Sequence, residues 1–456
     1  MHNSAVVKKT RRIFSVGALY DGAGRFLEEC EVYVDRGVVA RILSRADDGD
    51  ESNEFRRDYV GADRVDLPNG LMLPGLINSH HHAYSALARG MPLRGSFADF
   101  PSVLENLWWR LDRALDLEAV HLSGLVTAID SVHRGCTAVI DHHSSPGHIG
   151  GSLQALADAF DALSMTSVLC FETSDRNGAG TFEKSIEENL EFIAKHEAGR
   201  SVRGVFGLHA GFTLCRASLE RLAQIIPDHV PVHVHVAEDR CDVEHARAEG
   251  FAGPLDRLAA LGVLRRRSLI GHGVHLAGAE FDLLDASDAF LVHNPQSNFN
   301  NAVGYADLDR VPLARILLGT DGMSSDMLGA AQFAFLAYKG LGKAGRDPFE
   351  LARKMLFENP SGYVSALFGR TVGRIEEGSP AEFAVFGYRG PTPLDGGNLM
   401  AHLLYGLSPA PRASWVYARG VPVIEDGVLR AVDETSVLEA ANAKAATVWK
   451  RTLARS

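Results

Sequence analysis

The chain has few cysteines, and their arrangement excludes two kinds of protein. Its 456 residues include five cysteines, which are scattered along the sequence and form no Cys-x-x-Cys pair. An odd, dispersed set of this kind indicates reduced thiols rather than a disulfide framework. It also excludes an all-thiolate structural metal site. We therefore expect a cytoplasmic protein.

The sequence also lacks long apolar runs and an excess of positive charge. No apolar stretch approaches the roughly 20 residues that span a membrane, and the basic start, residues 1–12, is not followed by the apolar segment of a secretory signal. The formal net charge is −11, which disfavours phosphate backbones and anionic membranes as partners. These absences favour an enzyme acting on small molecules, with no nucleic-acid or membrane partner.

What is present is an ordinary globular composition with β-rich ends. Hydrophobic residues make up 46% and charged residues 23%, which suits one large domain and a smaller one. Strand-like pieces joined by Asp and Gly turns fill the first seventy residues and recur over 373–388 and 413–429. We interpret the very polar stretch 45–60 as a solvated loop and 434–453 as a final helix. The two ends are predicted to meet in one small β-sandwich.

The middle of the chain alternates short apolar strands with helix-like segments. About eight such strands occur between residues 72 and 369, and this alternation is typical of parallel βα units. The fold class is therefore predicted to be α/β, a distorted (β/α)₈ TIM-type barrel. The predicted division is 1–72 and 370–433 for the two parts of the sandwich, 73–369 for the barrel, and 434–456 for the C-terminal helix.

Three histidines end the first predicted barrel strand, where barrel enzymes keep their chemistry. Residues i and i+2 of a strand face the same way, so His80 and His82 can converge on one ion while His81 points away. Alone, this His-x-His pattern fits a buried hydrogen-bonding pair equally well.

Further strand ends supply the other candidate ligands and acid–base groups. In PVHVHVAED, His235 lies near the rim and is followed by Glu238. Glu238 is either an acid–base group of the site or a solvated loop carboxylate. His233 lies one layer deeper and suits a packed core histidine. His272 stands between two glycines, and Asp321 ends an apolar strand, although a turn aspartate has the same signature.

Together these pieces predict a metal site. Four residues would ligate the ion, and Glu238 and His272 would hold and deprotonate a water. Imidazole nitrogen and carboxylate oxygen suit Zn²⁺, with Fe²⁺ as the alternative. The predicted ligands are His80, His82, His235 and Asp321.

Seven motifs resemble those of one known family. They are PGLINSHHH, GLHAGFTL, HVHVAED, GHGVHL, HNPQSN, GTDG and the trailing GSPAEFAVF. The chain resembles the amidohydrolase superfamily, in the branch that holds cytosine, guanine and S-adenosylhomocysteine deaminases and the triazine hydrolases. Within that branch it most resembles the SsnA group of aminohydrolases, through HHHAYSALARGM, LENLWWRLDRAL, DHHSSP and FETSDRNG. One departure is Asn294, where the branch usually has a cysteine.

The resemblance implies the same ligand set around one divalent ion, with His209 falling where related deaminases hold the substrate. Binuclear relatives carry a bridging lysine at the end of the fourth strand, and the stretch 169–178 has none. Glu172 is the alternative bridge to a second ion. Trp108 and its neighbour Trp109 could stack on a planar ring or simply pack in the core. The other candidates for substrate contact are Arg89, His143, Asn298 and Ser325, while Asp141 and Asp326 are interpreted as structural.

The predicted reaction is hydrolytic deamination of an amino-substituted nitrogen heterocycle, such as a purine or pyrimidine. Asp321 and His272 would take the proton of the metal's water, and Glu238 would protonate the ring nitrogen and then the departing amine. One alternative keeps the site but displaces another leaving group or opens a cyclic amide. Another is a catalytically dead scaffold, which is disfavoured because no ligand is missing. Homologous barrels often form dimers, so a homodimer or higher homo-oligomer is expected.

Overall fold

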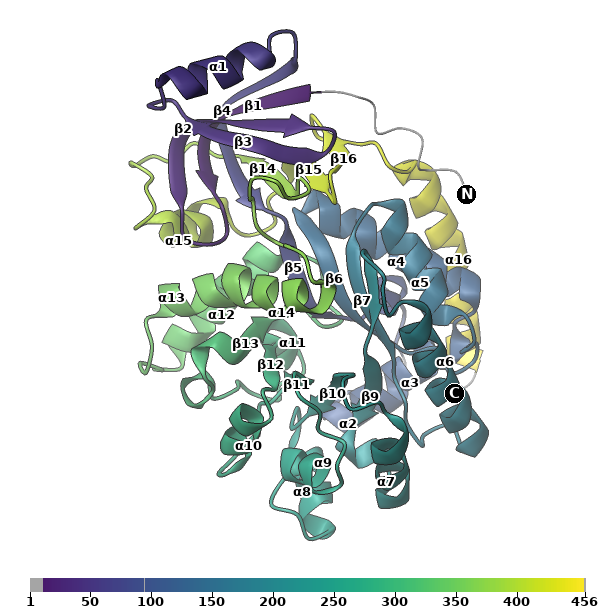
Figure 1. The fold of residues 1–456 in the computed structure, drawn as a ribbon. Helices are drawn as coiled ribbons and strands as arrows, with labels where there is room; N and C mark the ends of the chain where they lie inside the picture. Colours follow the sequence, from purple (N-terminus) through teal and green to yellow (C-terminus); the bar gives the residue numbers. More distant parts are fainter. Residues whose placement is uncertain (1–10, 94, 455–456) are drawn as a thin grey trace.

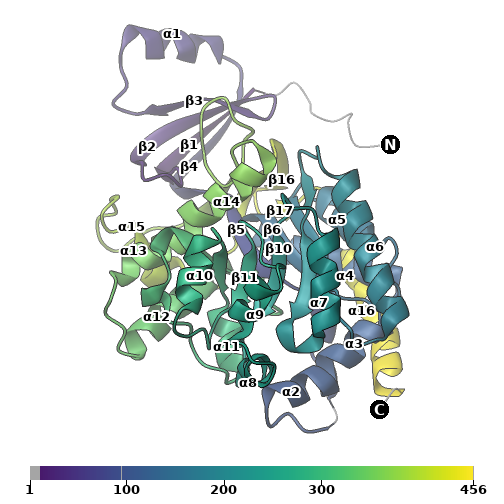
Figure 2. The same ribbon diagram turned by 60° about the horizontal axis from the view of Figure 1, so that its bottom comes forward.

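The computed structural model describes residues 11–93 and 95–454. The first ten residues, which carry most of the basic start, therefore lie outside the described part. A β-rich unit occupies one end of the molecule, and an α/β unit surrounded by helices makes up the rest (Figures 1 and 2).

Both ends of the chain contribute to one eight-stranded sheet. Its strand order is β17-β16-β15-β14-β4-β1-β2-β3, and the antiparallel pair β4–β14 joins the N-terminal half to the C-terminal half. The two β-rich ends of the chain therefore contribute strands to the same sheet. The strands are β1 (Arg11–Tyr20), β2 (Phe26–Asp35), β3 (Val38–Ser44), β4 (Asp63–Pro74), β14 (Phe383–Gly387), β15 (Ala413–Ala418), β16 (Val421–Glu425) and β17 (Val428–Leu429).

An aromatic cluster holds the two halves of this sheet together. The ring of Phe14 on β1 lies 5.2 Å from that of Phe383 and 5.7 Å from that of Tyr417, both in edge-on geometry. At the outer edge, the amide of Val39 on β3 donates to the carbonyl of Ser379. The sheet thus curves until its edge strand approaches the segment that precedes β14.

The interpretation of 45–60 as a loop is wrong, because residues Asp50–Asp58 form helix α1. Acidic residues occupy its first turn and basic residues its last, which complements the helix dipole. Phe55 packs its ring 5.1 Å from Tyr33 of β2 and 5.0 Å from Tyr59. Phe55 and Tyr59, the two aromatic residues of this charged stretch, therefore anchor the helix on the sheet through Tyr33.

The middle of the chain forms two parallel sheets, as predicted for an α/β fold. One has the order β5-β6-β7-β8 and the other β13-β12-β11-β10-β9. Isolated parallel bridges join them on both sides, between His81 and Asp321 and between Thr173 and Leu208. Their strands are β5 (Leu76–His81), β6 (Cys136–His143), β7 (Thr166–Phe171), β8 (Val202–Gly204), β9 (Phe206–Ala210), β10 (Val232–Val236), β11 (Leu269–His272), β12 (Phe290–His293) and β13 (Ile316–Leu318).

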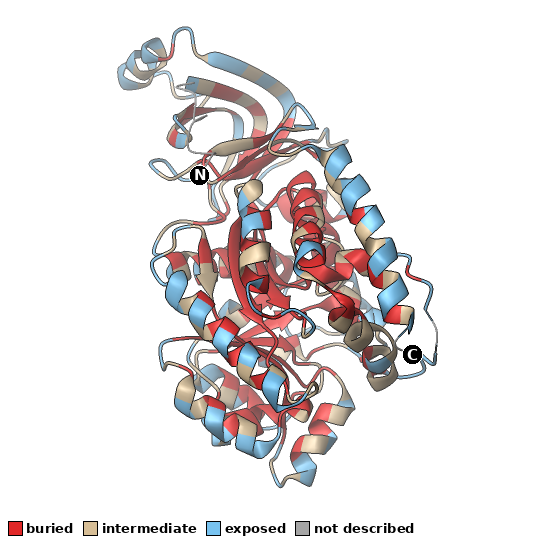
Figure 3. Ribbon diagram, turned by 90° about the vertical axis from the view of Figure 1, so that its right-hand side faces the viewer, coloured by how far each residue is buried: buried red, intermediate tan, exposed pale blue. Residues whose placement is uncertain are grey.

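Helices cover these sheets, with buried residues on the strands and exposed ones along the outer helix faces (Figure 3). Among the described residues, no helix combines the length and apolar character needed to cross a membrane. The helices important for the site and its supports are α2 (Phe100–Val103), α3 (Trp109–Ala114), α4 (Leu117–His133), α5 (Ser152–Ala162), α6 (Ala179–Lys195), α7 (Arg216–Ile225), α8 (Arg240–Ala248), α11 (Pro295–Asn300) and α12 (Met327–Gly340). The remainder are α9 (Pro254–Ala260), α10 (Glu280–Ala286), α13 (Pro348–Arg353), α14 (Asn359–Phe368), α15 (Leu399–His402) and α16 (Glu434–Ala454), the predicted final helix.

Candidate metal centre

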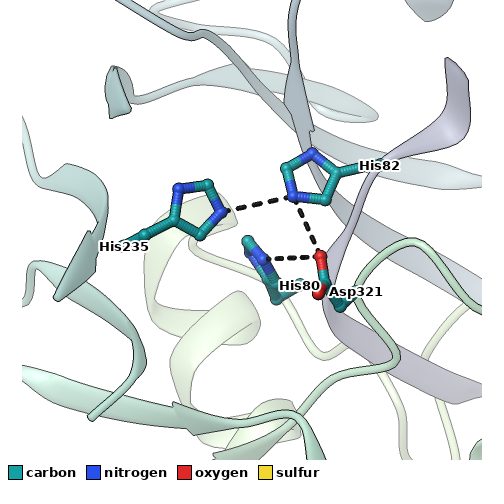
Figure 4. Close-up of side chains that lie close together, drawn as sticks. All are labelled: His80, His82, His235 and Asp321. Atoms are coloured by element: carbon teal, nitrogen blue, oxygen red, sulfur yellow. Dashed lines mark hydrogen bonds and ion pairs between the residues drawn. The ribbon is translucent and has the colours of Figure 1, made fainter. Parts of the chain in front are cut away.

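Four side chains from distant parts of the sequence converge at the ends of the parallel strands (Figure 4). His80 lies on β5 and His82 directly follows it, His235 lies on β10, and Asp321 follows β13. Each of the four offers one ligand atom, and these atoms all lie within 4.8 Å of one another. The sequence named these same four residues.

The distances within the cluster are short. Oδ1 of Asp321 lies 3.0 Å from Nε2 of His82 and 3.6 Å from Nε2 of His80. Nε2 of His82 lies 3.2 Å from Nε2 of His235. All three imidazoles are buried. The four side chains therefore present their polar atoms to one common centre.

Hydrogen bonds from the Nδ1 atoms of His82 and His235 determine whether their Nε2 atoms can accept or ligate. Nδ1 of His82 donates to the carbonyl oxygen of His142 at 2.5 Å, and Nδ1 of His235 donates to that of His209 at 2.7 Å. A carbonyl oxygen only accepts, so each neutral ring carries its proton on Nδ1 and a lone pair on Nε2. Two lone pairs 3.2 Å apart cannot hydrogen-bond to each other, whereas a cation between them satisfies both. The donor set thus fits a divalent metal.

The third ring is held differently. Nδ1 of His80 lies 2.8 Å from Nε2 of His233, whose Nδ1 lies 3.8 Å from the sulfur of Cys170. That thiol in turn donates to the carbonyl of Asp141. A consistent chain of donors therefore runs from His80 through His233 and Cys170 to the backbone. It leaves Nε2 of His80 as a bare acceptor, which has no hydrogen-bond partner among the described residues. His233, expected as a core histidine, is fully buried here.

Glu238 and His272 stand beside Asp321 as a second group. Nδ1 of His272 donates to Oδ1 of Asn298 at 2.7 Å, so its Nε2 is an acceptor. That Nε2 lies 3.5 Å from Oε2 of Glu238 and 4.0 Å from Oδ2 of Asp321. Burial, reinforced by the charge of Asp321, raises the pKa of Glu238 well above its ordinary value. This group therefore combines an acceptor nitrogen with a carboxyl that tends to keep its proton.

The backbone at two of these positions adopts a conformation that ordinary residues avoid. Asp321 has φ 54° and His272 has φ 69°, both in the left-handed region. The backbone at Gly319, two residues before Asp321, packs closely against His80, because a Cβ on Gly319 would lie 2.8 Å from Cβ of His80. The side-chain oxygen of Ser297 also donates to Oδ2 of Asp321. Local strain and tight packing thus direct the aspartate at the histidines.

A pocket opens over the cluster, and its walls include His82, His235, Glu238, His272 and Asp321. Its outer walls are mainly apolar. Phe100 and Leu104 come from the α2 region, and Phe212 follows β9. The remaining apolar side chains that line it are Tyr84, Trp108, Trp109, Ala210 and Met323.

Two of the predicted substrate contacts line this pocket. Trp108 lies in its wall, as does His209. Nδ1 of His209 lies 2.9 Å from the hydroxyl of Thr213, which itself donates to the carbonyl of Ala210. His209 therefore donates to Thr213 through Nδ1 and keeps its Nε2 as an acceptor.

The other four candidates lie elsewhere. Asn298 is fully buried behind His272, and His143 bonds the hydroxyl of Ser145 at 2.8 Å. Arg89 and Ser325 line a separate small cavity next to Asp130. Asn298 thus orients His272. From the sequence, Asn298 was a candidate for contact with the substrate.

The residues interpreted as structural have structural partners. Oδ2 of Asp141 accepts from the amide of Ala83 at 2.6 Å, and Asp326 caps α12 by accepting from the amide of Gly329. Nδ1 of His81 lies 3.1 Å from the hydroxyl of Thr320, away from the cluster. Asn294 is fully buried before α11 and is not among the described residues that line the pocket.

An ionic group in the wall of the pocket was not predicted from the sequence. Nη2 of Arg176 donates to Glu172 at 2.5 Å and to Asp112 at 3.1 Å. All three side chains are buried, and the guanidinium lies 4.8 Å from the ring centre of Trp109. Burial raises the pKa of Glu172 to about 7, while Arg176 opposes that rise. Glu172 is committed to this group and belongs to neither set of candidate ligands found in the described part of the chain.

The fold is α/β and the site offers a ligand set that could hold a divalent metal. Comparison with known proteins identifies the family. Residues 71–423 match the model of the amidohydrolase family. Because the match spans more than half of the sequence, the chain belongs to the amidohydrolase family.

Individual relatives agree with this assignment. The chain is 29% identical over 433 residues to a 5-methylthioadenosine/S-adenosylhomocysteine deaminase of Syntrophomonas wolfei subsp. wolfei, covering 91% of this chain and 94% of that one. Two solved structures share the fold. An adenosine deaminase from Xanthomonas campestris with bound zinc has a TM-score of 0.76 at 21% identity, covering 98% and 99% of the two chains. An atrazine chlorohydrolase from Arthrobacter aurescens TC1 complexed with zinc has a TM-score of 0.76 at 18% identity, covering 95% and 100%. The predicted family and the prediction of a metal-dependent aminohydrolase are confirmed.

Proposed function

We propose that the protein hydrolyses an amino-substituted nitrogen heterocycle and releases ammonia. The observation that carries this proposal is the convergence of three bare imidazole nitrogens and the carboxylate of Asp321, with Glu238 and His272 beside them. The deaminases among the relatives support the same reaction. The ring would be a purine, a pyrimidine or a related amidine-like heterocycle.

One divalent ion would be held by His80, His82, His235 and Asp321. Zinc is the proposed metal, because three imidazoles and one carboxylate suit it and two structural neighbours contain it. Such an ion lowers the pKa of a bound water towards about 7 and polarises the bond under attack. Glu172 is paired with Arg176, which supports one metal rather than two.

The neighbouring side chains would carry the protons. Nε2 of His272 and Oδ2 of Asp321 are acceptors within 4.0 Å of each other, so they can share the proton taken from the attacking water. Glu238, whose pKa is raised by burial, can give a proton to the ring nitrogen beside the reacting carbon. Left as a carboxylate, Glu238 would take the proton of the hydroxyl newly bound to that carbon and pass it to the departing amine, while the proton held by His272 and Asp321 would return to Glu238. Ammonia leaves, and a carbonyl group remains on the ring.

The alternatives concern the leaving group and the presence of activity. An atrazine chlorohydrolase shares the fold, so displacement of chloride or opening of a cyclic amide on the same site is the second candidate. A catalytically dead scaffold is disfavoured, because the full ligand set converges in one place. Assaying metal-replete enzyme for ammonia across purines, oxidised purines, pyrimidines and pterins separates these reactions.

The first prediction concerns Glu238→Gln. This substitution removes the transferable proton and preserves the shape of the side chain, so kcat should fall by about 100-fold or more. Zinc content, measured by atomic emission on the same preparations, should stay at one ion per chain, because Glu238 is not one of the four ligands. Normal ammonia release by this variant would contradict the proposed role.

The proposal includes an architecture for the whole chain. β8 and β9 are separated only by Val205, so the two parallel sheets can be counted as eight strands, and bridges join the sheets on both sides. This supports a distorted (β/α)₈ barrel over 73–369. The curvature of the terminal sheet supports a sandwich formed by 1–72 and 370–433, followed by the helix of 434–456. A cytoplasmic homodimer or higher oligomer, without a nucleic-acid partner, remains our expectation.

A further inference from the structure

Asp321 presents its two carboxylate oxygens to two different groups of side chains. Oδ1 lies 3.6 and 3.0 Å from the Nε2 atoms of His80 and His82. Oδ2 lies 4.0 Å from Nε2 of His272 and accepts from the hydroxyl of Ser297, which leaves it a second lone pair. A carboxylate that offers one oxygen to each side can bridge two cations, as in two-metal sites. Asp321 therefore belongs both to the four-ligand cluster and to a second set of candidate ligands.

The second set consists of Glu238, His272 and Asp321. One ligand atom from each lies within 4.8 Å of the others, and Oε2 of Glu238 lies 3.5 Å from Nε2 of His272. Asn301 donates to the other oxygen, Oε1 of Glu238, at 3.4 Å. One imidazole and two carboxylates suit a divalent cation of the zinc type. The set therefore has the atoms that such a cation requires.

His272 has a ring nitrogen that still requires a partner. Its Nδ1 donates to Asn298, so its Nε2 carries a lone pair rather than a proton. The side chain is only 1% exposed, and this Nε2 has no hydrogen-bond partner among the described residues. A proton on Glu238 would not satisfy it, because 3.5 Å is too long for a good O–H···N bond. A buried acceptor of this kind is costly unless it is paired, and a cation between the three residues pairs it.

The charges around this set determine how strongly it holds a cation. All three residues line the pocket, and none of the described residues that line it is a lysine or an arginine. Two effects weaken the binding. Burial favours the protonated form of Glu238, and a cation must displace that proton. A cation in the four-ligand cluster also repels a second one. The second set should therefore fill only when the divalent metal is in excess.

We propose that Glu238, His272 and Asp321 form a second, weaker site for a divalent cation such as Zn²⁺, and that filling this site inhibits the enzyme. The binding itself needs no assumption about the reaction. The inhibition rests on the proposed deamination, because a cation here occupies the lone pair of His272 and the carboxylate of Glu238 that would move the protons. The ion in the four-ligand cluster stays in place.

Counting bound zinc tests the site without any substrate. The full chain is dialysed to equilibrium against increasing free Zn²⁺, and bound zinc is measured by atomic emission. One ion should bind first, and a second should bind at concentrations about 100-fold higher or more, because like charges placed side by side are strongly unfavourable. Saturation at one ion per chain would overturn the proposal.

Two substitutions assign the second ion to these residues. Glu238→Gln and His272→Asn each remove one ligand, so the second ion should bind about 10-fold more weakly or worse while the first still binds. Asparagine also tolerates the left-handed backbone at His272, where φ is 69°. A second ion that binds both variants with wild-type affinity would overturn the assignment.

Asp239→Asn is the matched control. It removes a neighbouring carboxylate that lines the same pocket but lies outside the second set. Asp239 caps α8 by accepting from the amide of Cys241, and asparagine can do the same. This variant should bind both ions as the wild type does. Loss of the second ion in Asp239→Asn alone would place the site elsewhere in the pocket and overturn the proposal.

Turnover measured on the same preparations separates the inhibition from the proposed reaction. Ammonia release should fall by about 100-fold as the second ion binds, and a chelator that lowers free Zn²⁺ to the level filling only the first site should restore it. Undiminished turnover with two ions bound would contradict the inhibition. If a second ion binds to these residues but no heterocycle releases ammonia, the reaction is wrong and the site stands. If ammonia is released and only one ion ever binds, the reaction stands and the second site is wrong.

Discussion

At the scale of single residues, the metal ligands differ in what holds them. His82 and His235 each donate to a backbone carbonyl, whereas His80 donates to another side chain, His233. A partner behind a ligating imidazole fixes its tautomer and raises its basicity. His233 is therefore a positioning residue for one ligand, and its own position depends on Cys170.

We predict that His233→Phe weakens zinc binding by about 10- to 100-fold. Phenylalanine fills the space but cannot accept from Nδ1 of His80, so this ring loses its fixed orientation. Competition with a chromophoric chelator measures the dissociation constant. His233→Gln places an acceptor near the same point and should restore most of the affinity. Wild-type affinity in a folded His233→Phe protein would show that the contact is only packing.

The residue scale also shows the limit of sequence reasoning. His80 and His82 could be predicted because two residues on a strand face the same way, and Glu238 because it follows His235 at a strand end. Asp112 and Arg176 could not, because α3 and the loop after β7 are 64 residues apart and neither has a metal or catalytic motif. Their meeting is a tertiary contact.

At the scale of elements, helix α16 fastens the C-terminus to the metal-bearing part of the chain. The indole nitrogen of Trp449 donates to the carbonyl of Leu87, five residues beyond His82. Arg451 and Lys444 bind the carboxylate of Asp116, which also caps α4 by accepting from the amide of Ala119. The final helix thus supports the segment that follows the first ligands.

The Asp116 contacts predict a pH dependence. Burial tends to raise the pKa of Asp116, but hydrogen bonds from Arg451, the Ala119 amide and Lys444 outweigh it and hold the pKa at about 2. A depressed pKa in the folded state stabilises the protein above the unfolded value near 3.8, and this contribution is lost as the pH falls towards 2.

Asp116→Asn keeps a good helix cap and removes the charge. It should therefore lower the free energy of unfolding by about 1 to 2 kcal/mol at pH 7. The difference from wild type should be unchanged at pH 5, smaller at pH 3, and near zero towards pH 2. Urea unfolding at each pH measures it. A difference that stays constant from pH 7 to pH 3 would contradict the pKa assignment.

At the scale of the whole molecule, the metal cluster joins the two parallel sheets. His80 and His82 belong to the sheet of β5, while His235 and Asp321 belong to that of β10 and β13. Nε2 of His82 and Nε2 of His235 face each other at 3.2 Å in a buried space, and both Nδ1 atoms already donate to backbone carbonyls. An ion that binds only the folded chain should therefore stabilise the whole unit.

We predict that removing the metal lowers the melting temperature by several degrees. An ion present at about 1,000 times its dissociation constant adds about 4 kcal/mol to the folded state. Calorimetry of chelator-treated protein, with and without added zinc, measures the effect. Asp321→Asn, which weakens the site, should gain little from zinc. Equal melting temperatures of the treated and zinc-loaded wild type would show that the cluster holds no structural ion.

The sequence by itself determined the alternation of strands and helices in the middle of the chain, the four candidate ligands and the family, because these depend on periodicity and on motifs within a few residues. It did not determine α1, whose charged composition resembles a loop until Phe55 meets Tyr33 and Tyr59. Only the tertiary structure decided which side chains line the pocket. It placed Asn298 behind His272, placed Arg89 and Ser325 in another cavity, and brought Asp112 to Arg176. The physical reason is that strand ends fix directions locally, whereas a pocket wall is assembled from loops whose meeting depends on the packing of the whole chain.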